Sequence, residues 1–254
     1  MKFDHLTRKP AKPNPILFTI CLFATIPWGA KAQSKWAGNV ETTVVSAYLY
    51  RGSKFGGASV QPSAIATYDN KFTVGVWGSY AFEKIQPNIF NPVEDSYNET
   101  DLLANYAFNT DKYTVILGGT LYTADNLRDG EGKYFDHYFE TYFAFSLKHK
   151  LNPGISYWRE TGRLSGNYIE LSINPSFPLN ERASIGIRSY IGLLASSADF
   201  FTERDEYYGT DVTLSYDLGK KFYLRGNVTF IRTTTRGLRS KNRIVPGITV
   251  GRRW

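Results

Sequence analysis

The sequence ends in GITVGRRW, residues 247–254, a strand-like alternation and not a polar tail. Ile248, Val250 and Trp254 fall on even positions, and glycine, threonine and arginine fill the others. Chain termini are usually frayed and polar. In a membrane barrel, by contrast, every backbone polar group must be paired, so the last strand has to close on the first. The stretch therefore predicts a closed β-barrel.

The same alternation with a period of two runs along the chain from Asn39 onward. In FTVGVWGSYAF, residues 72–82, the even positions carry Phe, Val, Tyr or Gly, and the odd positions other than Trp77 are small or polar. Residues 138–147 (YFETYFAFSL) and 167–174 (NYIELSIN) repeat this pattern of one apolar and one polar face. We expect twelve strands, at residues 38–50, 60–68, 71–82, 98–108, 112–122, 136–147, 151–161, 165–175, 182–193, 206–218, 221–232 and 242–254.

The length of these segments favours a membrane barrel over the alternative, a soluble antiparallel sheet with a terminal strand. Most of the segments have 9–13 residues. Ordinary globular strands have about 5–6 residues, whereas a tilted strand that crosses a bilayer needs about 9–11. After the N-terminus the sequence has no apolar run of 18 residues, which excludes a helical membrane protein.

The connections between the expected strands alternate in length. The short ones are YDNK, NTDK, KHKL, FPLNE and DLGKK, at residues 68–71, 109–112, 148–151, 177–181 and 217–221. The intervening connections are longer, except for TGRLSG at residues 161–166. Outer-membrane barrels have an even number of strands, short periplasmic turns and longer extracellular loops. The alternation therefore predicts that both chain ends lie on the periplasmic side.

The N-terminus has the three parts of a secretory signal. Basic residues open it, the apolar run of residues 16–30 follows, and Ala30-Lys31-Ala32 supplies the small residues of a cleavage site. We expect residues 1–32 to be removed and Gln33 to begin the mature chain, a single barrel domain of residues 33–254. A membrane anchor is the alternative, but the run is short for spanning a bilayer. A lipoprotein signal at Cys21 is disfavoured by the large Ile20 before it.

Cleavage would change the charge and remove the single cysteine. The segment 1–32 holds five of the 30 Lys and Arg residues and one of the 23 Asp and Glu residues, so 25 against 22 leaves a net charge of +3. Without Cys21 the mature chain has no disulfide, cysteine metal site or thiol nucleophile. Charges of both signs are spread along the chain, which is not the footprint of a nucleic-acid-binding protein.

The polar face of each strand predicts the lining of the lumen. Arg188 and Arg225 lie between apolar neighbours in mid-strand, and an Arg on the lipid face near the bilayer centre costs about 2–4 kcal/mol, so both should point inward. By the same alternation we expect the lumen to be lined by Asp101, Glu140, Glu160, Glu170, Arg188, Asp211, Arg225, Arg243, Tyr142 and Tyr168. Ile248 and Val250 should face lipid, and Trp254 should lie in the periplasmic aromatic girdle.

This lining has two interpretations. Ion pairs between lumenal acids and bases would fill and stiffen a closed barrel without adding much stability. Alternatively, the charges line a path for a polar solute. Eight strands leave an interior that side chains fill, and 16–18 leave a wide channel, so twelve strands with many lumenal aromatics predict a narrow pore.

Catalytic and metal sites are disfavoured. Asp136 and His137 are adjacent in an expected strand, so their side chains point to opposite faces and cannot form a dyad. His149 belongs to a short turn. The acids of the third loop, Asp125, Asp129 and Glu131, lack the spacing of a calcium loop. We expect no catalytic residue, no cofactor and no metal.

The segment VVSAYLYRGSKFGG, residues 44–57, carries a resemblance to a known family. Its Ser46, Tyr48, Arg51 and Gly52 match an S-x-Y-x-x-R-G pattern, and a later G-x-W-x-S pattern is matched around Trp77. With the E-x-Y and Y-x-E-L elements at residues 140–142 and 168–171, the chain resembles the Gcw_chp family of conserved hypothetical bacterial proteins over residues 38–230. The resemblance implies an exported, barrel-like protein and adds little on mechanism. We expect Arg51 at the barrel rim, paired with an inner acid such as Asp101.

Together these observations predict a porin-like barrel in the outer membrane of a Gram-negative bacterium. The expected function is a narrow channel for small polar solutes, and the alternative is a closed structural barrel that displays its loops or binds an envelope partner. Expected partners are outer-membrane lipid and the barrel assembly machinery, which the C-terminal strand of Ile248, Val250 and Trp254 would contact. The expected state is a monomer without nucleic acid.

Overall fold

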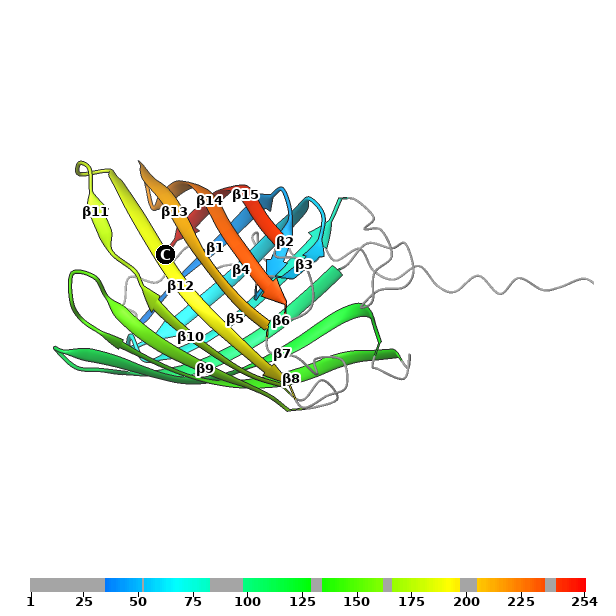
Figure 1. Cartoon of the computed structure of the whole chain (residues 1–254). Coiled ribbons are helices and arrows are strands. Elements are labelled where there is room, and N and C mark those ends of the chain that lie inside the picture. Colours follow the sequence, from blue (N-terminus) through cyan, green and yellow to red (C-terminus); the bar gives the residue numbers. More distant parts are fainter. Residues whose placement is uncertain are drawn as a thin grey trace, which may run out of the picture. The chain divides into compact units, whose positions relative to one another are not determined.

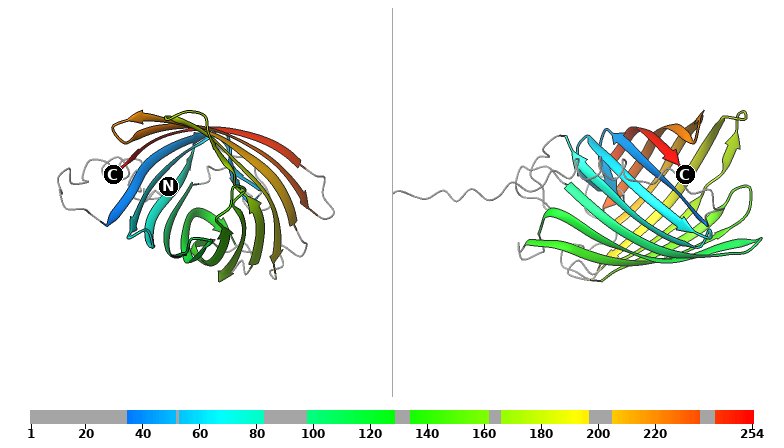
Figure 2. Two further views of the ribbon diagram at one scale, coloured as in Figure 1. Left: turned by 90° about the vertical axis from the view of Figure 1, so that its left-hand side faces the viewer. Right: turned by 180° about the vertical axis from the view of Figure 1, so that it is seen from behind.

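A computed structural model describes residues 35–51, 53–82, 98–128, 134–161, 166–196, 205–235 and 241–254 (Figure 1). The expected signal segment 1–32 lies outside the described residues. Residues 35–254 form one compact unit, which is an antiparallel sheet wound into a barrel (Figure 2). None of the described residues belongs to a helix long and apolar enough to cross a membrane.

Twelve strands make the barrel wall in the described part of the chain, which confirms the expected fold class. They are β1 (Trp36–Val45), β4 (Ser59–Tyr68), β5 (Phe72–Ala81), β6 (Asn98–Asn109), β7 (Tyr113–Arg128), β8 (Tyr134–Leu147), β9 (Pro153–Thr161), β10 (Gly166–Ile173), β12 (Ala183–Ser196), β13 (Asp205–Gly219), β14 (Phe222–Thr235) and β15 (Lys241–Arg253). The short β11 (Ser176–Pro178) pairs with β12, as β10 does, so it continues the path of β10 after an interruption. Two further strands, β2 (Tyr48–Tyr50) and β3 (Ser53–Gly56), form a separate hairpin.

The last strand closes the barrel on the first. β15 pairs antiparallel with β1, with Val44 opposite Ile248 and Thr42 opposite Val250. The backbone N–H of Trp254 donates to the carbonyl oxygen of Gly38 at 3.1 Å, so pairing continues to the final residue. This seam explains why the chain ends on an alternating, aromatic-terminated stretch.

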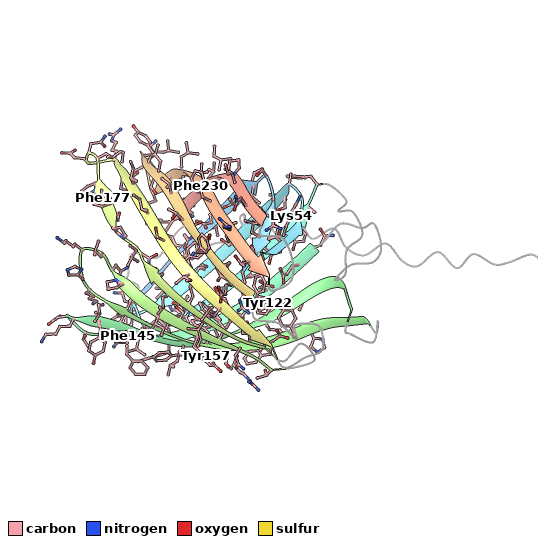
Figure 3. The ribbon with its side chains drawn as sticks, in the orientation of Figure 1. Lys54, Tyr122, Phe145, Tyr157, Phe177 and Phe230 are labelled. Carbon is pink, nitrogen blue, oxygen red and sulfur yellow. The ribbon has the colours of Figure 1, made fainter. Side chains whose placement is uncertain are left out.

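The two faces of the wall differ as the alternation predicts. Large apolar side chains remain exposed on the outer face, including Ile244 at 66% and Val250 at 53%. Tyr157 and Phe230 belong to the same outer face (Figure 3). In a soluble protein such a continuous apolar surface would drive association. On the outside of a closed barrel, an apolar band of this kind is typical of barrels that span a membrane.

Two expected strands differ from the structure by more than three residues at one end. The first was expected to run through residues 38–50 but leaves the wall after Val45, because Tyr48–Tyr50 turns back onto β3 and not onto β4. The strand expected at residues 112–122 extends to Arg128, since its pairing with β8 resumes beyond a register shift between Thr123 and Leu127.

The short connections gather at one end of the barrel, here called the turn end, with the chain end at Trp254. The β4–β5 turn contains Asp69 and Asn70 at φ values of 52° and 54°. Asp and Asn tolerate this left-handed conformation better than other residues with side chains. The opposite end is called the loop end, and most of its connections lie outside the described residues.

The outer face can be tested by two neighbouring substitutions on β14. Phe230 is 46% exposed on the outer face, whereas Thr229 lines the interior. Phe230→Arg places a charge in hydrocarbon and is expected to lower the unfolding free energy in lipid by about 2–4 kcal/mol. Thr229→Arg is the matched control and should cost much less. Urea titration in liposomes, followed by heat-dependent gel mobility, measures both, and equal losses would contradict the assigned faces.

Candidate functional site

The barrel encloses a cavity of about 570 Å³. Wall residues from β10, β12, β13 and β14 line it, among them Glu170, Arg188, Asp211 and Arg225. Residues 47–51, which precede and include the tip of the β2–β3 hairpin, line it as well. The site therefore combines a charged wall with a segment that lies inside the lumen.

The β2–β3 hairpin spans the lumen. On one side, the hydroxyl of Tyr48 donates to Glu99 of β6 at 2.5 Å, and the ring of Tyr48 lies 5.5 Å from that of Trp77. On the other side, Leu49 packs against a cluster that includes Tyr207 of β13. In the closed strand order β6 and β13 are opposite each other. The hairpin thus bridges opposite walls and narrows the passage between them.

The tip of the hairpin has an unusual backbone. Tyr50 pairs with Ser53, so the loop between them has two residues, and Arg51 takes the first position with φ of 46°. Two-residue hairpin loops favour positive φ, which suits Asn and Gly but not Arg. Strained residues of this kind persist where the surroundings hold them, and they concentrate at functional sites.

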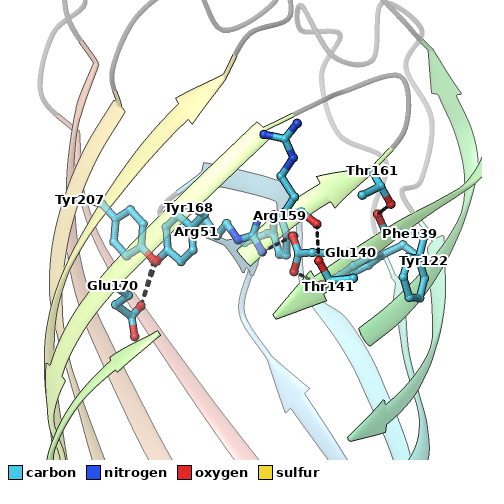
Figure 4. Close-up of polar contacts among 11 residues, drawn as sticks. Arg51, Tyr122, Phe139, Glu140, Thr141, Arg159, Thr161, Tyr168, Glu170 and Tyr207 are labelled. Atoms are coloured by element: carbon cyan, nitrogen blue, oxygen red, sulfur yellow. Dashed lines mark hydrogen bonds and ion pairs between the residues drawn. The ribbon is translucent and has the colours of Figure 1, made fainter. Parts of the chain in front are cut away.

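The surroundings of Arg51 explain how the tip is held. Its guanidinium forms an ion pair with Glu140 of β8. It also lies 4.5 Å from the ring centre of Tyr168 (Figure 4). The ring centres of Tyr50 and Trp158 are 4.6 Å and 5.6 Å away. A planar guanidinium stacks on aromatic rings and pairs with carboxylates at once. Arg51 does pair with an inner acid, but this acid is Glu140 and not the expected Asp101, and the tip folds inward to line the cavity instead of lying at the rim.

Two further arginines of the wall have carboxylate partners. Arg188 pairs with Glu170 and with Asp211, the latter at 3.1 Å. Arg225 pairs with Glu41 of β1, which also accepts from the hydroxyl of Tyr223. Glu41 was missing from the residues expected in the lumen, although it alternates with Thr43 and Val45, so the pattern contained the signal.

Carboxylates concentrate on the wall formed by β6, β8 and β9. Glu99, Asp101 and Glu140 are 2%, 7% and 1% exposed, and Glu160 lies opposite Glu140 in the register. Arg51 pairs with this wall through Glu140. Arg188, Arg225 and Arg243 lie on β12, β14 and β15. The lumen therefore has an acidic side and a side where acids and bases alternate.

The remaining residues that were expected to line the lumen, or that belong to the family-like motif, have the following contacts. Tyr142 lies 6.4 Å from Trp158 between ring centres, and Arg243 donates to the hydroxyl of Thr233 at 3.5 Å. Asp101 is opposite Trp77 in the β5–β6 register. The exposed Ser46 donates its backbone N–H to Pro246 next to the seam. Gly52 lies outside the described residues.

The histidines and loop acids form no site that the structure describes. His137 is exposed on β8, and His149 accepts the backbone N–H of Leu151 in its turn. The described residues contain no group of three or more His, Cys, Asp or Glu that could hold a metal ion. Asp129 and Glu131 lie outside the described residues, as does the side chain of Asp125.

A closed antiparallel barrel of twelve strands around a charged lumen is the architecture of outer-membrane barrels. The chain superposes on the KdgM porin with a TM-score of 0.54 at 12% identity, over 85% of this chain and 98% of that chain. The NanC porin gives 0.53 at 11%, over 85% and 98%, and the COG4313 outer membrane channel from Pseudomonas putida F1 gives 0.51 at 13%, over 90% and 99%. At these identities the likeness establishes the fold, which is that of the porin barrels. No family model and no curated protein matches the sequence.

Proposed function

We propose that the protein is a narrow outer-membrane channel for small polar solutes. The observation that carries this proposal is the cavity of about 570 Å³ beside the hairpin, lined by ionised side chains of both signs. A barrel built only for stability gains little from buried ion pairs, which often stabilise less than apolar packing would. Charged groups along an aqueous path, in contrast, remain solvated and offer hydrogen bonds to a passing solute.

One observation favours the second candidate, a closed barrel that serves a structural or binding role. The β2–β3 hairpin bridges opposite walls through Tyr48 and Leu49, and Arg51 ties its tip to β8. If this bridge is permanent, the lumen is closed to solutes and to ions. The two candidates then differ in whether the folded protein conducts.

The proposal includes where the protein is located and which partners it contacts. The signal-like segment 1–32 would direct export from the cytoplasm of a Gram-negative cell, and the outer face would contact outer-membrane lipid. The aromatic-terminated strand β15 would be the segment that the barrel assembly machinery engages, and the barrel would be a monomer. We also propose kinship with the Gcw_chp family, because its S-x-Y-x-x-R-G pattern coincides with the segment that enters the lumen.

Ion selectivity tests the proposed path. Arg188 is 40% exposed at its side chain within the lumen, and Arg188→Gln removes a positive charge from beside Glu170 and Asp211. The variant is expected to shift the reversal potential in a salt gradient toward cation selectivity. Arg232→Gln is the control, since Arg232 lies on the outer face of β14. An unchanged reversal potential in a conducting Arg188→Gln barrel would exclude Arg188 from the path.

A further inference from the structure

Three of the groups that surround the Arg51 guanidinium belong to the barrel wall, and the fourth, Tyr50, belongs to the hairpin itself. Glu140, Trp158 and Tyr168, here called the cation cage, lie on the adjacent strands β8, β9 and β10. Glu140 supplies a carboxylate, and the other two supply aromatic faces. These are the groups that proteins use to bind organic cations. Figure 4 shows the Arg51 guanidinium between Tyr168 and Glu140.

The cage is held in place by the wall itself. Tyr168 is 2% exposed, donates to Glu170 at 2.9 Å and stacks on Tyr207 with an interplanar angle of 6°. Glu170 is in turn fixed by Arg188. These contacts involve no residue of the hairpin, so one aromatic face of the cage stays oriented when the hairpin moves.

The other two members have wall contacts as well. The ring of Trp158 lies 4.8 Å from that of Tyr168, and Glu140 accepts from the hydroxyl of Tyr122 at 3.2 Å. Glu140 is 1% exposed, so its carboxylate is held in a low-dielectric position where removal of its cation is costly. A buried carboxylate next to aromatic rings of the wall favours a bound cation beside it.

We propose that the cation cage is a binding site for small guanidinium-bearing solutes, and that Arg51 is its tethered occupant. A solute with a planar guanidinium makes the same stacking and ionic contacts as Arg51. By displacing Arg51 it frees the hairpin tip from β8, which widens the passage. The inference rests on the proposed function, since the solute has to reach the cage through the lumen.

The tether sets how strongly a free solute competes. A tethered ligand acts at an effective concentration in the millimolar range, so a solute meets an occupied site in the unchanged protein. The left-handed backbone at Arg51 disfavours the occupied state and makes displacement easier. Removal of the Arg51 side chain should therefore expose a site that a free guanidinium can fill.

Calorimetry with methylguanidinium tests the site. The full mature protein and its Arg51→Ala variant are titrated in detergent, with sodium chloride at equal ionic strength as the background. Arg51→Ala is expected to bind methylguanidinium one to one and at least about tenfold more tightly than the unchanged protein. Arg51→Gln serves as a second variant that preserves bulk and hydrogen bonding. Heat-dependent gel mobility confirms that each variant is folded.

Two further variants make the result specific. Arg51→Ala combined with Glu140→Gln lacks the carboxylate and should lose the binding. Arg225→Ala removes another lumenal arginine, paired with Glu41, and should gain none. Absence of binding in both folded Arg51 variants overturns the inference. Because calorimetry needs no transport, binding by a barrel that never conducts would preserve the cage and reject the proposed channel.

Discussion

Replacing residues 46–58 with Asn-Gly should raise solute flux several-fold. Val45 and Ser59 are directly opposite in the β1–β4 register, so a two-residue turn can join them without disturbing either strand. The deletion removes the hairpin that bridges β6 and β13 across the lumen. Liposome swelling with neutral polar solutes of increasing size measures the change, and the size limit should rise along with the rate.

The control for this deletion keeps the hairpin and removes only one of its hydrogen bonds to the wall. Tyr48→Phe removes the hydroxyl that donates to Glu99 but preserves the packing of the ring on Trp77. It should change flux much less than the deletion does. If the deletion variant folds and swelling stays at the original rate, the hairpin does not restrict the passage.

Substitution of Gly38 is expected to prevent barrel closure. A Cβ atom at this position would lie 2.2 Å from Cζ2 of Trp254 and 2.3 Å from the carbonyl oxygen of Ile65. The second neighbour is backbone and cannot move without breaking the β1–β4 ladder. Overpacking alone costs about 1–3 kcal/mol, and the lost seam pairing adds to this. Gly38→Val should therefore fail to yield the heat-modifiable, folded species.

A second glycine shows whether this effect is local. Gly226 of β14 also lies in a wall strand, but no atom is within 4 Å of the position where its Cβ would stand. Gly226→Ala should fold with little loss of stability, and Gly226→Val serves as the size-matched control for Gly38→Val. Normal folding of Gly38→Val would contradict the close seating of Trp254 on the seam.

The wall of the barrel could be predicted from the sequence because the period of two is a local property. Each expected strand overlaps a strand of the structure, and the pairing of residues 247–251 with β1 follows from the need to leave no open edge. The inward direction of Arg188 and Arg225 follows from the cost of a charge in hydrocarbon. The alternation of the strands depends only on residues that are close in the chain. The closing strand pair and the inward arginines follow from the properties of the bilayer.

The hairpin in the lumen could not be predicted in this way. Tyr48 and Tyr50 continue the alternation of β1, so the pattern of residues 38–50 does not distinguish a wall strand from a hairpin that turns inward. The partner of Arg51 is a matter of long-range geometry, since Glu140 is 89 residues away along the chain. Arg51 lies in a turn with positive φ, and the direction of that turn depends on which carboxylate the folded wall presents.

Unitary conductance in a planar bilayer is the most direct test of a solute path through the lumen. The mature protein is refolded, its folded state is confirmed by heat-dependent gel mobility, and currents are recorded in symmetric salt. If the lumen is a narrow path for solutes, the unchanged protein gives small, discrete current steps, and the variant with residues 46–58 replaced by Asn-Gly gives larger ones. A folded barrel that gives no steps with or without the hairpin would contradict a solute path through the lumen.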